Sequence, residues 1–192
     1  MRYNFSFLIV FLFHLISLTF AEESWLKFRL AASVDDVRLC QALRHQIFVQ
    51  EQKVPADTEL DGKDDDALHI MCLNENDGAL VATGRCLLVL AVEGEQQEES
   101  TTTTKASTTQ QFQAVLGRIA VHAEYRGRGI GQQVVRQLEQ HAAKRKATRV
   151  TLTPHSYLYD FYARLGYQQV PGTGLISVNE HCTLIQMEKL LI

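Results

Sequence analysis

Residues 117–131 have the sequence Gly-Arg-Ile-Ala-Val-His-Ala-Glu-Tyr-Arg-Gly-Arg-Gly-Ile-Gly, in which an apolar run leads into a glycine-rich turn. Apolar residues at helical spacing follow, and they predict a helix from about residue 129 to 146. Glycines allow a tight turn, and the start of a helix offers unpaired amides and a positive dipole end. The turn is therefore predicted to bind an anion such as a phosphate or pyrophosphate. Arg126 and Arg128 would add positive charge.

Two common phosphate-binding motifs do not fit this turn. A Walker loop requires Gly-Lys-Ser/Thr, which is missing. A dinucleotide fingerprint requires a different glycine spacing near the start of a Rossmann unit, whereas three expected strands precede this turn. The simpler alternative is a tight turn that only begins a helix.

The rest of the chain predicts an α/β (α+β) domain with a mixed sheet. Ser33 begins a capping-box pattern, and hairpin signals precede the glycine-rich turn, while a β-α-β pattern follows it. Strands are expected at about 24–30, 68–73, 79–92, 114–121, 148–153, 166–170 and 182–190, and helices at about 33–50, 129–146 and 157–165.

Residues 94–113 differ from their surroundings. They are polar and low in complexity, with four consecutive threonines. Such a segment buries too little apolar surface to order itself. We interpret it as a flexible insertion between two strands of one domain that spans residues 22–192.

Composition narrows the functional classes. The chain has 192 residues, a formal net charge of −3 and 46% hydrophobic residues, which suits one globular domain and disfavours a disordered chain. The slightly acidic balance argues against nucleic-acid binding. The four cysteines include no closely spaced pair, so no metal site is expected, and most of them are expected to be reduced and buried.

Residues 1–21 form a separate apolar segment. They resemble a secretory signal, and the stretch without acidic or basic residues is also long enough for a membrane anchor. A dispensable extension or a misassigned start site is the remaining alternative. Any membrane contact is expected through this segment alone.

Three motifs in order resemble the GNAT acetyltransferase superfamily, particularly its ElaA-like branch. The first is Arg126-x-x-Gly129-x-Gly131 after the apolar strand, and the second is Phe161-Tyr162-Ala163-Arg164-Leu165-Gly166-Tyr167. The third comprises Arg44, Phe48-Val49, Glu51-Gln52, Glu59, Asp61, His69 and Ala82-Thr83-Gly84-Arg85. The resemblance covers roughly residues 25–190.

The resemblance implies a mostly antiparallel, twisted sheet flanked by helices, and transfer of an acetyl group from acetyl-CoA to an amine. Backbone amides of the glycine-rich turn would hold the pyrophosphate, the preceding strand would pair with the pantetheine arm, and an amide near Val121 would polarise the thioester carbonyl. The implied cofactor-binding residues are Ile119, Ala120, Val121, Arg126, Gly127, Arg128, Gly129, Ile130, Gly131 and Gln132.

Two catalytic residues follow from the resemblance. Tyr162 matches the family tyrosine that protonates the leaving thiolate, and its alternative is a packed aromatic ring. Glu51 is the first candidate base for the amine, ahead of His69 and a water chain. The alternative for Glu51 is a solvated helix end or an ion pair with Arg44.

Phe48, Asp61, His69 and Arg85 are the expected substrate-binding residues. His69 has a buried core role as its alternative, and Arg85 an ion pair with an acid among residues 61–66. The expected substrate is a small-molecule amine, taken by a monomer or a homodimer. A peptide or protein N-acetyltransferase and a catalytically silent CoA-binding module are the alternatives. The cofactor favours the cytoplasm, whereas residues 1–21 favour the secretory pathway or a membrane.

The sequence departs from the family pattern at two further places. Pro154-His155 stands where many relatives have Gln or Asn, and Asn179-Glu180-His181-Cys182 lacks a common Gly-Ile-x-His segment. These departures concern the acceptor and leave the cofactor prediction in place.

Overall fold

The computed structural model describes residues 25–90, 112–179 and 182–191. The strands are β1 (Leu26–Leu30), β2 (Leu68–Asn74), β3 (Leu80–Leu90), β4 (Phe112–Val121), β5 (Ala147–Leu152), β6 (Gln168–Gln169), β7 (Ile176–Asn179), β8 (Cys182–Leu184) and β9 (Met187–Leu190). The helices are α2 (Val34–Arg44), the π-helix η1 (His45–Glu51), α3 (Ala56–Glu59), the 3-10 turns η2 (Ala123–Tyr125) and η3 (Ser156–Leu158), α4 (Ile130–Lys144) and α5 (Tyr159–Ala163).

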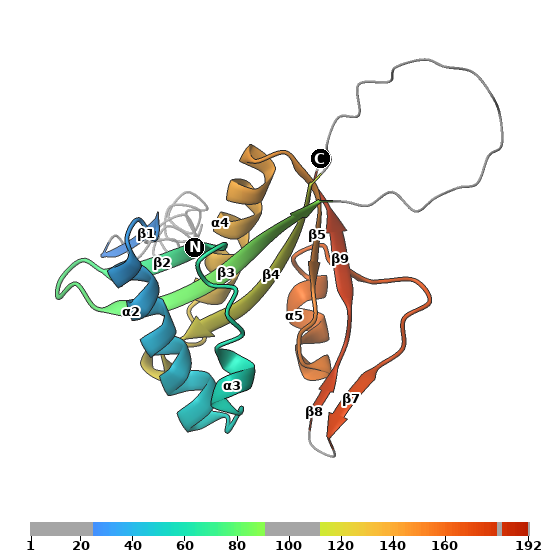
Figure 1. Ribbon diagram of the computed structural model, residues 1–192, viewed down its shortest axis with the longest axis horizontal. Helices are drawn as coiled ribbons and strands as arrows, with labels where there is room; N and C mark the ends of the chain where they lie inside the picture. Colours follow the sequence, from blue (N-terminus) through green and yellow to red (C-terminus); the bar gives the residue numbers. More distant parts are fainter. Residues whose placement is uncertain (1–24, 91–111, 180–181, 192) are drawn as a thin grey trace, which may run out of the picture.

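The larger sheet has the strand order β1-β2-β3-β4-β5-β9-β6, and β7 pairs with β8 in a separate two-stranded sheet. Neighbouring strands of the larger sheet are antiparallel except for β4 and β5. These two strands are parallel, and α4 connects them in the chain. Figure 1 shows β4 and β5 starting together and then diverging. The predicted mixed sheet in a single α/β domain is confirmed.

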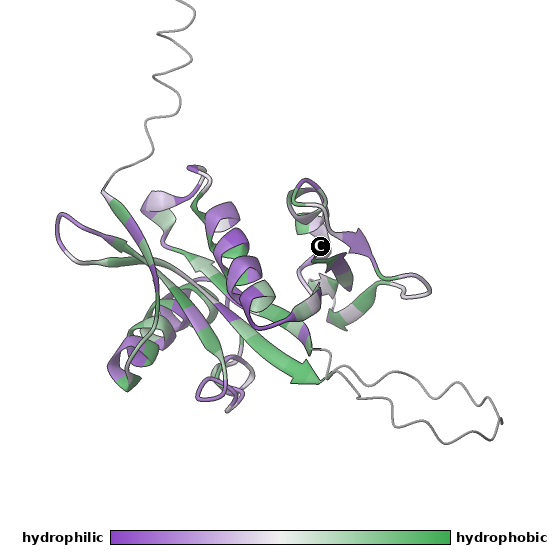
Figure 2. Ribbon diagram, turned by 90° about the horizontal axis from the view of Figure 1, so that it is seen from above, coloured by the Kyte–Doolittle hydropathy of each residue, from purple (hydrophilic) through white to green (hydrophobic). Residues whose placement is uncertain are grey.

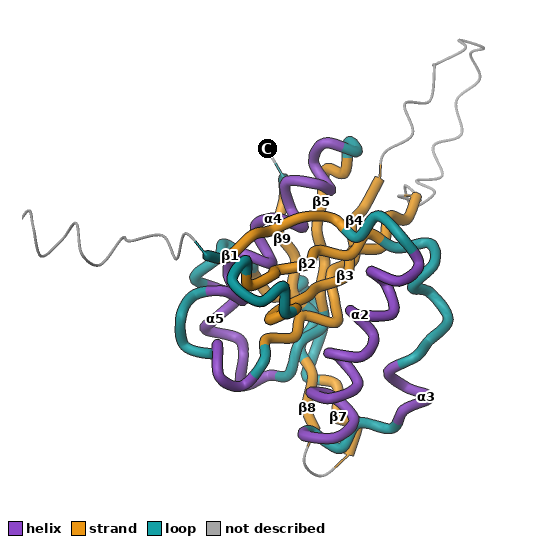
Figure 3. The backbone as a smooth tube through the Cα atoms, turned by 90° about the vertical axis from the view of Figure 1, so that its left-hand side faces the viewer, coloured by secondary structure: helices purple, strands orange, loops and turns teal. Residues whose placement is uncertain are grey.

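Helices cover both faces of the larger sheet. Figure 3 shows α2 and α3 on one side of the strands and α4 and α5 on the other. The main core lies under α4, whose buried face includes Val134, Val135 and Leu138, and a smaller cluster under α2 joins Leu43 and Ile47. In Figure 2 hydrophilic and hydrophobic residues alternate along the turns of the helices, as expected for helices with one buried face.

The first helix begins as predicted but ends differently. The Ser33 hydroxyl accepts a hydrogen bond from the Asp36 amide at 3.1 Å and caps α2. After Arg44 the helix widens into η1, and the Gln52 amide donates to the Ile47 carbonyl five residues earlier. The predicted helix over residues 33–50 is therefore an α-helix followed by a π-helix, a form that apolar spacing does not distinguish.

Strand β4 contains a bulge next to β3. Thr83 lies opposite Ala120 and Arg85 opposite Gly117, so Gly84 alone faces two residues of β4. Arg118 takes a positive φ of 55° at this bulge. On the other side of β3, a side chain at Gly84 would meet Val134 Cγ1 at 2.6 Å, so α4 packs directly on its backbone.

Two predicted boundaries are wrong. Phe112 and Gln113 belong to β4, so the predicted insertion at 94–113 is shorter at its end, and its residues 94–111 lie outside the described residues. The predicted strand 182–190 is two strands, β8 and β9, because its chain leaves one sheet and joins the other. Strand β7 was not predicted.

The cysteines of the described residues carry free thiols: Cys40, Cys72 and Cys86 are buried and Cys182 is half-buried. This agrees with the prediction of mostly buried, reduced cysteines. Residues 1–21 lie outside the described residues. Among those that are described, no helix has the length and apolar character needed to cross a membrane.

Candidate active site

The divergence of β4 and β5 is the central feature of the site. Their parallel pairing ends at Val115 and Thr151, and in the described chain residues 116–121 continue along β3. The His122 amide donates to the Val81 carbonyl of β3 at 2.8 Å. Because backbone directions alternate along a strand, the Val121 N–H points away from β3, toward the β5 side. This N–H can donate a hydrogen bond to an acceptor in the divergence, such as a thioester carbonyl oxygen.

The glycine-rich turn lies at the same end of the sheet. Gly127 and Gly129 both have φ of 77°, and Gly129 caps the start of α4. No atom lies within 4 Å of a Cβ built at either glycine, so open space faces the turn. The first amides of α4 precede its first internal hydrogen bond, from Gln133 to Gly129. Ile130, Gly131 and Gln132 therefore offer amides where an anion would sit, which fits a pyrophosphate.

Arg126 joins this turn to the end of η1. Its guanidinium donates two hydrogen bonds to the Glu51 carboxylate, at 2.6 and 2.7 Å, and a third from Nε to the Val121 carbonyl at 3.0 Å. The hydrogen bonds from Arg126 lower the pKa of Glu51. Glu51 remains 44% exposed, so its carboxylate is ionised and open to solvent. The alternative pairing of Glu51 with Arg44 is wrong, because Arg44 binds Glu59 and Asp64.

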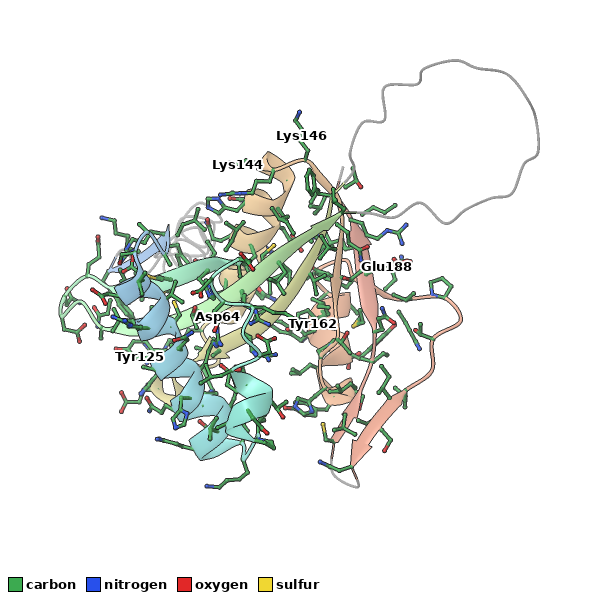
Figure 4. All side chains as sticks on the ribbon, viewed as in Figure 1. Asp64, Tyr125, Lys144, Lys146, Tyr162 and Glu188 are labelled. Atoms are coloured by element: carbon green, nitrogen blue, oxygen red, sulfur yellow. The ribbon has the colours of Figure 1, made fainter. Side chains whose placement is uncertain are left out.

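Tyr162 lies on α5, beside the divergence of β4 and β5 (Figure 4). Its ring packs edge-on against Phe161 and Tyr167, with centroids 4.9 and 5.8 Å away, and its side chain is nearly buried. Burial raises the pKa of Tyr162 to about 12, so the phenol keeps its proton at neutral pH. Tyr162 is both the packed ring of the alternative prediction and a suitable proton donor.

Phe48 lies in η1, on the side of the sheet covered by α2. It packs against the small cluster of Leu43, Ile47 and Ala120. Ala120 is one of the residues predicted to line the pantetheine arm and is 2% exposed. Phe48 thus packs against the cluster that joins η1 to this part of β4.

Asp61 and Arg85 belong to a closed ring of six charges of alternating sign, which we call the ion-pair ring. Asp61 accepts two hydrogen bonds from Arg85, at 2.6 and 2.7 Å, so the alternative prediction of an ion pair for Arg85 is confirmed. The hydrogen bonds from Arg85 lower the pKa of Asp61 to about 2. In order around it, the members are Arg44, Glu59, Arg118, Asp61, Arg85 and Asp64.

Residues 51–66, which we call the acidic loop, contain seven acidic residues, and three of them belong to the ion-pair ring. Glu59 and Asp64 are 2% and 5% exposed, and Arg44 is completely buried. Figure 4 shows Asp64 between α2 and the sheet. Three of the acids in residues 51–66 therefore hold internal cations, while Asp57, Asp65 and Asp66 remain exposed.

His69 is buried in β2, at 2% exposure, beside the ion-pair ring. Its Nε2 lies 3.0 Å from the Asp64 carbonyl, and Nδ1 is buried without a protein partner among the described residues. Burial lowers the pKa of His69. These contacts agree with the core alternative for His69.

Three residues near the site were not singled out by sequence reasoning: Arg118 and Asp64 in the ion-pair ring, and His122, which directly follows Val121 at the end of β4. The position of His122 directly after the apolar strand was a usable signal. No signal in the sequence predicted the partners of Arg118, because they lie almost 60 residues earlier in the chain. Across the described residues, no cluster of three His, Cys, Asp or Glu side chains could hold a metal ion.

Solved structures share this architecture. An acyl-CoA N-acyltransferase from Pseudomonas aeruginosa is 26% identical, with a TM-score of 0.64 over 85% of this chain and 99% of that one. Escherichia coli ElaA is 24% identical, with a TM-score of 0.63 over 85% and 99%. Arabidopsis thaliana NAA60 in complex with a bisubstrate analogue is 16% identical, with a TM-score of 0.63 over 87% and 99%.

Comparison of the sequence with models of protein families identifies the family. The model of the acetyltransferase (GNAT) family matches residues 37–167, which is more than half of the chain. That range includes the glycine-rich turn, the β4–β5 divergence and α5. The chain belongs to the GNAT acetyltransferase family.

Proposed function

We propose that this acyltransferase moves an acetyl group from acetyl-CoA to the primary amine of a small molecule. One observation carries the proposal: the glycine-rich turn, the start of α4 and the Val121 amide that faces the β4–β5 divergence all lie at one end of the sheet. An anion site beside an outward-facing strand amide suits a diphosphate followed by a thioester.

The backbone performs most of the binding in this proposal. Amides of residues 127–132 hold the pyrophosphate, with Arg126 and Arg128 adding charge. The pantetheine arm pairs with the backbone of Ile119, Ala120 and Val121. It occupies the position next to β4 where β5 no longer pairs with it, beyond Thr151. The Val121 amide then donates to the thioester carbonyl oxygen, which becomes more negative as the amine attacks.

Tyr162 is the proposed general acid. The amine nitrogen bonds to the carbonyl carbon, the carbon–sulfur bond of the thioester breaks, and the thiolate takes the phenolic proton. The phenol is protonated at neutral pH, as a proton donor must be, while the rise of its pKa to about 12 makes it a weaker acid than an exposed tyrosine.

Glu51 is the proposed base that removes the proton from the acceptor amine. Its exposed carboxylate is accessible to an incoming substrate, whereas His69 is 2% exposed. Its pairing with Arg126 keeps it ionised at neutral pH. A water chain ending at Glu51 would serve an amine that does not reach the carboxylate directly.

The exposed acids Asp57, Asp65 and Asp66 support a cationic amine substrate, because negative charge near the acceptor side raises its local concentration. A peptide amine remains the second candidate for the acceptor. The proposed boundary of the acceptor site consists of four residues. Asp61 and Arg85 belong to the ion-pair ring, and Phe48 and His69 lie outside it.

A release assay tests this function. The full chain is incubated with acetyl-CoA and a panel of small amines and amino-terminal peptides, and free CoA thiol is measured. We expect release with one or more small amines. Release with peptides alone would favour the peptide alternative, and bound acetyl-CoA without release would favour a silent CoA-binding module.

The location of the protein is also a proposal. A supply of acetyl-CoA favours the cytoplasm, and residues 1–21 make the secretory pathway or a membrane the alternative. Microscopy of the full chain with a carboxy-terminal fluorescent tag, compared with residues 22–192, tests the contribution of that segment.

A further inference from the structure

The ion-pair ring reaches β4 through Arg118. Its Nε lies 2.5 Å from the Glu59 carboxylate, and Nη2 lies 3.3 Å from Asp61. The same guanidinium donates to two backbone carbonyls, those of Thr58 at 2.8 Å and Glu59 at 3.2 Å. One side chain of β4 thus binds four acceptors, three from α3 and one, Asp61, from the loop that follows it.

The backbone at Arg118 is in a conformation that favours glycine. Its φ of 55° lies in the left-handed region, which a residue with a branched or long side chain keeps only when its surroundings hold it there. Arg118 is one of two β4 residues opposite Gly84 in the bulge. The four contacts of its guanidinium stabilise this backbone conformation.

The bulge determines which backbone groups face the β4–β5 divergence. Within a strand, the directions of the backbone N–H groups and of the side chains alternate, so one added or removed residue reverses them. Residues 119–121, the segment proposed to bind the pantetheine and thioester, come directly after Arg118. If the bulge slipped by one residue, the Val121 amide would turn toward β3.

We propose that Arg118 is a positioning residue for acyl transfer: through the ion-pair ring it fixes the β4 bulge, and the bulge directs the Val121 amide toward the thioester. The inference rests on the proposed function. It assigns Arg118 no contact with either substrate. It also joins the acidic loop on the acceptor side to the strand that holds the acetyl group, because Glu59 and Asp61 are bound to the same guanidinium.

The test compares Arg118→Gly with Lys146→Gly. Glycine accepts the positive φ at both positions, since Lys146 has φ of 64°, and Lys146 lies at the far end of α4 (Figure 4). Both variants relieve the same backbone strain, but only Arg118→Gly removes the hold on the bulge. We expect Arg118→Gly to lower kcat at least about tenfold, as for a displaced catalytic group, and to weaken the Kd for acetyl-CoA much less, because the pyrophosphate turn before α4 stays intact. Lys146→Gly should match the wild type.

Arg118→Lys is the second variant, which keeps the charge and the aliphatic stem. Lysine lacks the planar guanidinium of arginine, so it cannot contact both carboxylates and both backbone carbonyls at once. The kcat of Arg118→Lys should therefore fall between those of the wild type and Arg118→Gly. Hydrogen exchange of the free proteins gives a readout that needs no activity. Protection of the His122 amide, which donates to Val81, should fall in Arg118→Gly while that of α4 remains.

The outcomes separate the inference from the function on which it rests. If the wild type transfers acetyl groups and Arg118→Gly keeps both its kcat and the protection of His122, the inference is overturned while the proposed function stands. If the wild type binds no acetyl-CoA, the proposed function fails. Hydrogen exchange then still tests whether Arg118 fixes the bulge. Unchanged protection of the His122 amide in Arg118→Gly would overturn this part of the inference too.

Discussion

Tyr162 and Glu51 show how the surroundings of a side chain set its chemistry. The phenol is nearly buried among aromatic rings, and its pKa rises to about 12. The carboxylate is exposed beside Arg126, and its pKa falls. These opposite shifts give one group that holds its proton and one that has lost it, as an acid and a base of the same reaction require.

Replacing Tyr162 by phenylalanine removes the acid and keeps the ring. We expect kcat to fall by about 100-fold, a typical loss for one general acid, while the Kd for acetyl-CoA stays unchanged. Steady-state kinetics and calorimetry measure the two quantities. Tyr167→Phe is the matched control, because Tyr167 is also buried on the edge of the Tyr162 ring. Equal kcat values for Tyr162→Phe and the wild type would exclude the assignment.

Replacing Arg126 by alanine tests Glu51 through its pKa. Arg126 lowers the pKa of Glu51, so in the wild type the carboxylate stays ionised to a lower pH. Without Arg126 the pKa rises toward its ordinary value of about 4.3, and the acidic loss of kcat begins at a higher pH. The measurement is kcat against pH at saturating acetyl-CoA. An unshifted acidic limb would show that another group accepts the proton.

At the scale of the elements, the glycines have two different roles. Gly127 and Gly129 supply a turn with positive φ and open space. Gly84 instead allows β3 and α4 to approach closely, because a Cβ there would lie 2.6 Å from Val134 and 3.0 Å from Leu138. The first role concerns binding and the second concerns stability.

Gly84→Ala therefore tests the packing of α4 on β3. Overpacking of this kind costs about 1–3 kcal/mol, which would lower the Tm by roughly 2–4 °C for each kcal/mol in a domain of this size. Thermal unfolding followed by circular dichroism measures it. Gly174→Ala, where a Cβ meets no atom within 4 Å, should leave the Tm unchanged. A Gly84→Ala variant as stable as Gly174→Ala would contradict the close contact.

Elements with local signals could be predicted from the sequence. Ser33 caps α2 and the glycine-rich turn begins α4, because both depend on a few neighbouring residues. The π-helix η1 and the bulge at Arg118 could not, since both have the apolar pattern of an ordinary helix or strand. In the site, the sequence predicted an ion pair between Arg85 and an acid among residues 61–66, but not that Arg118 joins it, because the partners of Arg118 lie almost 60 residues earlier in the chain.

At the scale of the whole molecule, one parallel strand pair in an otherwise antiparallel sheet organises the function. The α4 crossover makes β4 and β5 parallel, and their divergence exposes the Val121 amide beside the glycine-rich turn. From the opposite face of the sheet, α3 and the loop that follows it reach the same strand through Glu59 and Asp61 of the ion-pair ring. In the proposed function, the cofactor and acceptor sides of the site would therefore meet on β4.

The central claim is that the turn before α4 binds the pyrophosphate of acetyl-CoA. The most direct test is calorimetric titration of acetyl-CoA into the full chain and into Gly129→Glu and Gly172→Glu. Both glycines have φ of 77° and open space at the Cβ, so the two variants carry the same strain and charge. We predict binding to the wild type and to Gly172→Glu, and none to Gly129→Glu, where a carboxylate would face the pyrophosphate. Equal binding to Gly129→Glu and Gly172→Glu, or no binding to the wild type, would contradict the claim.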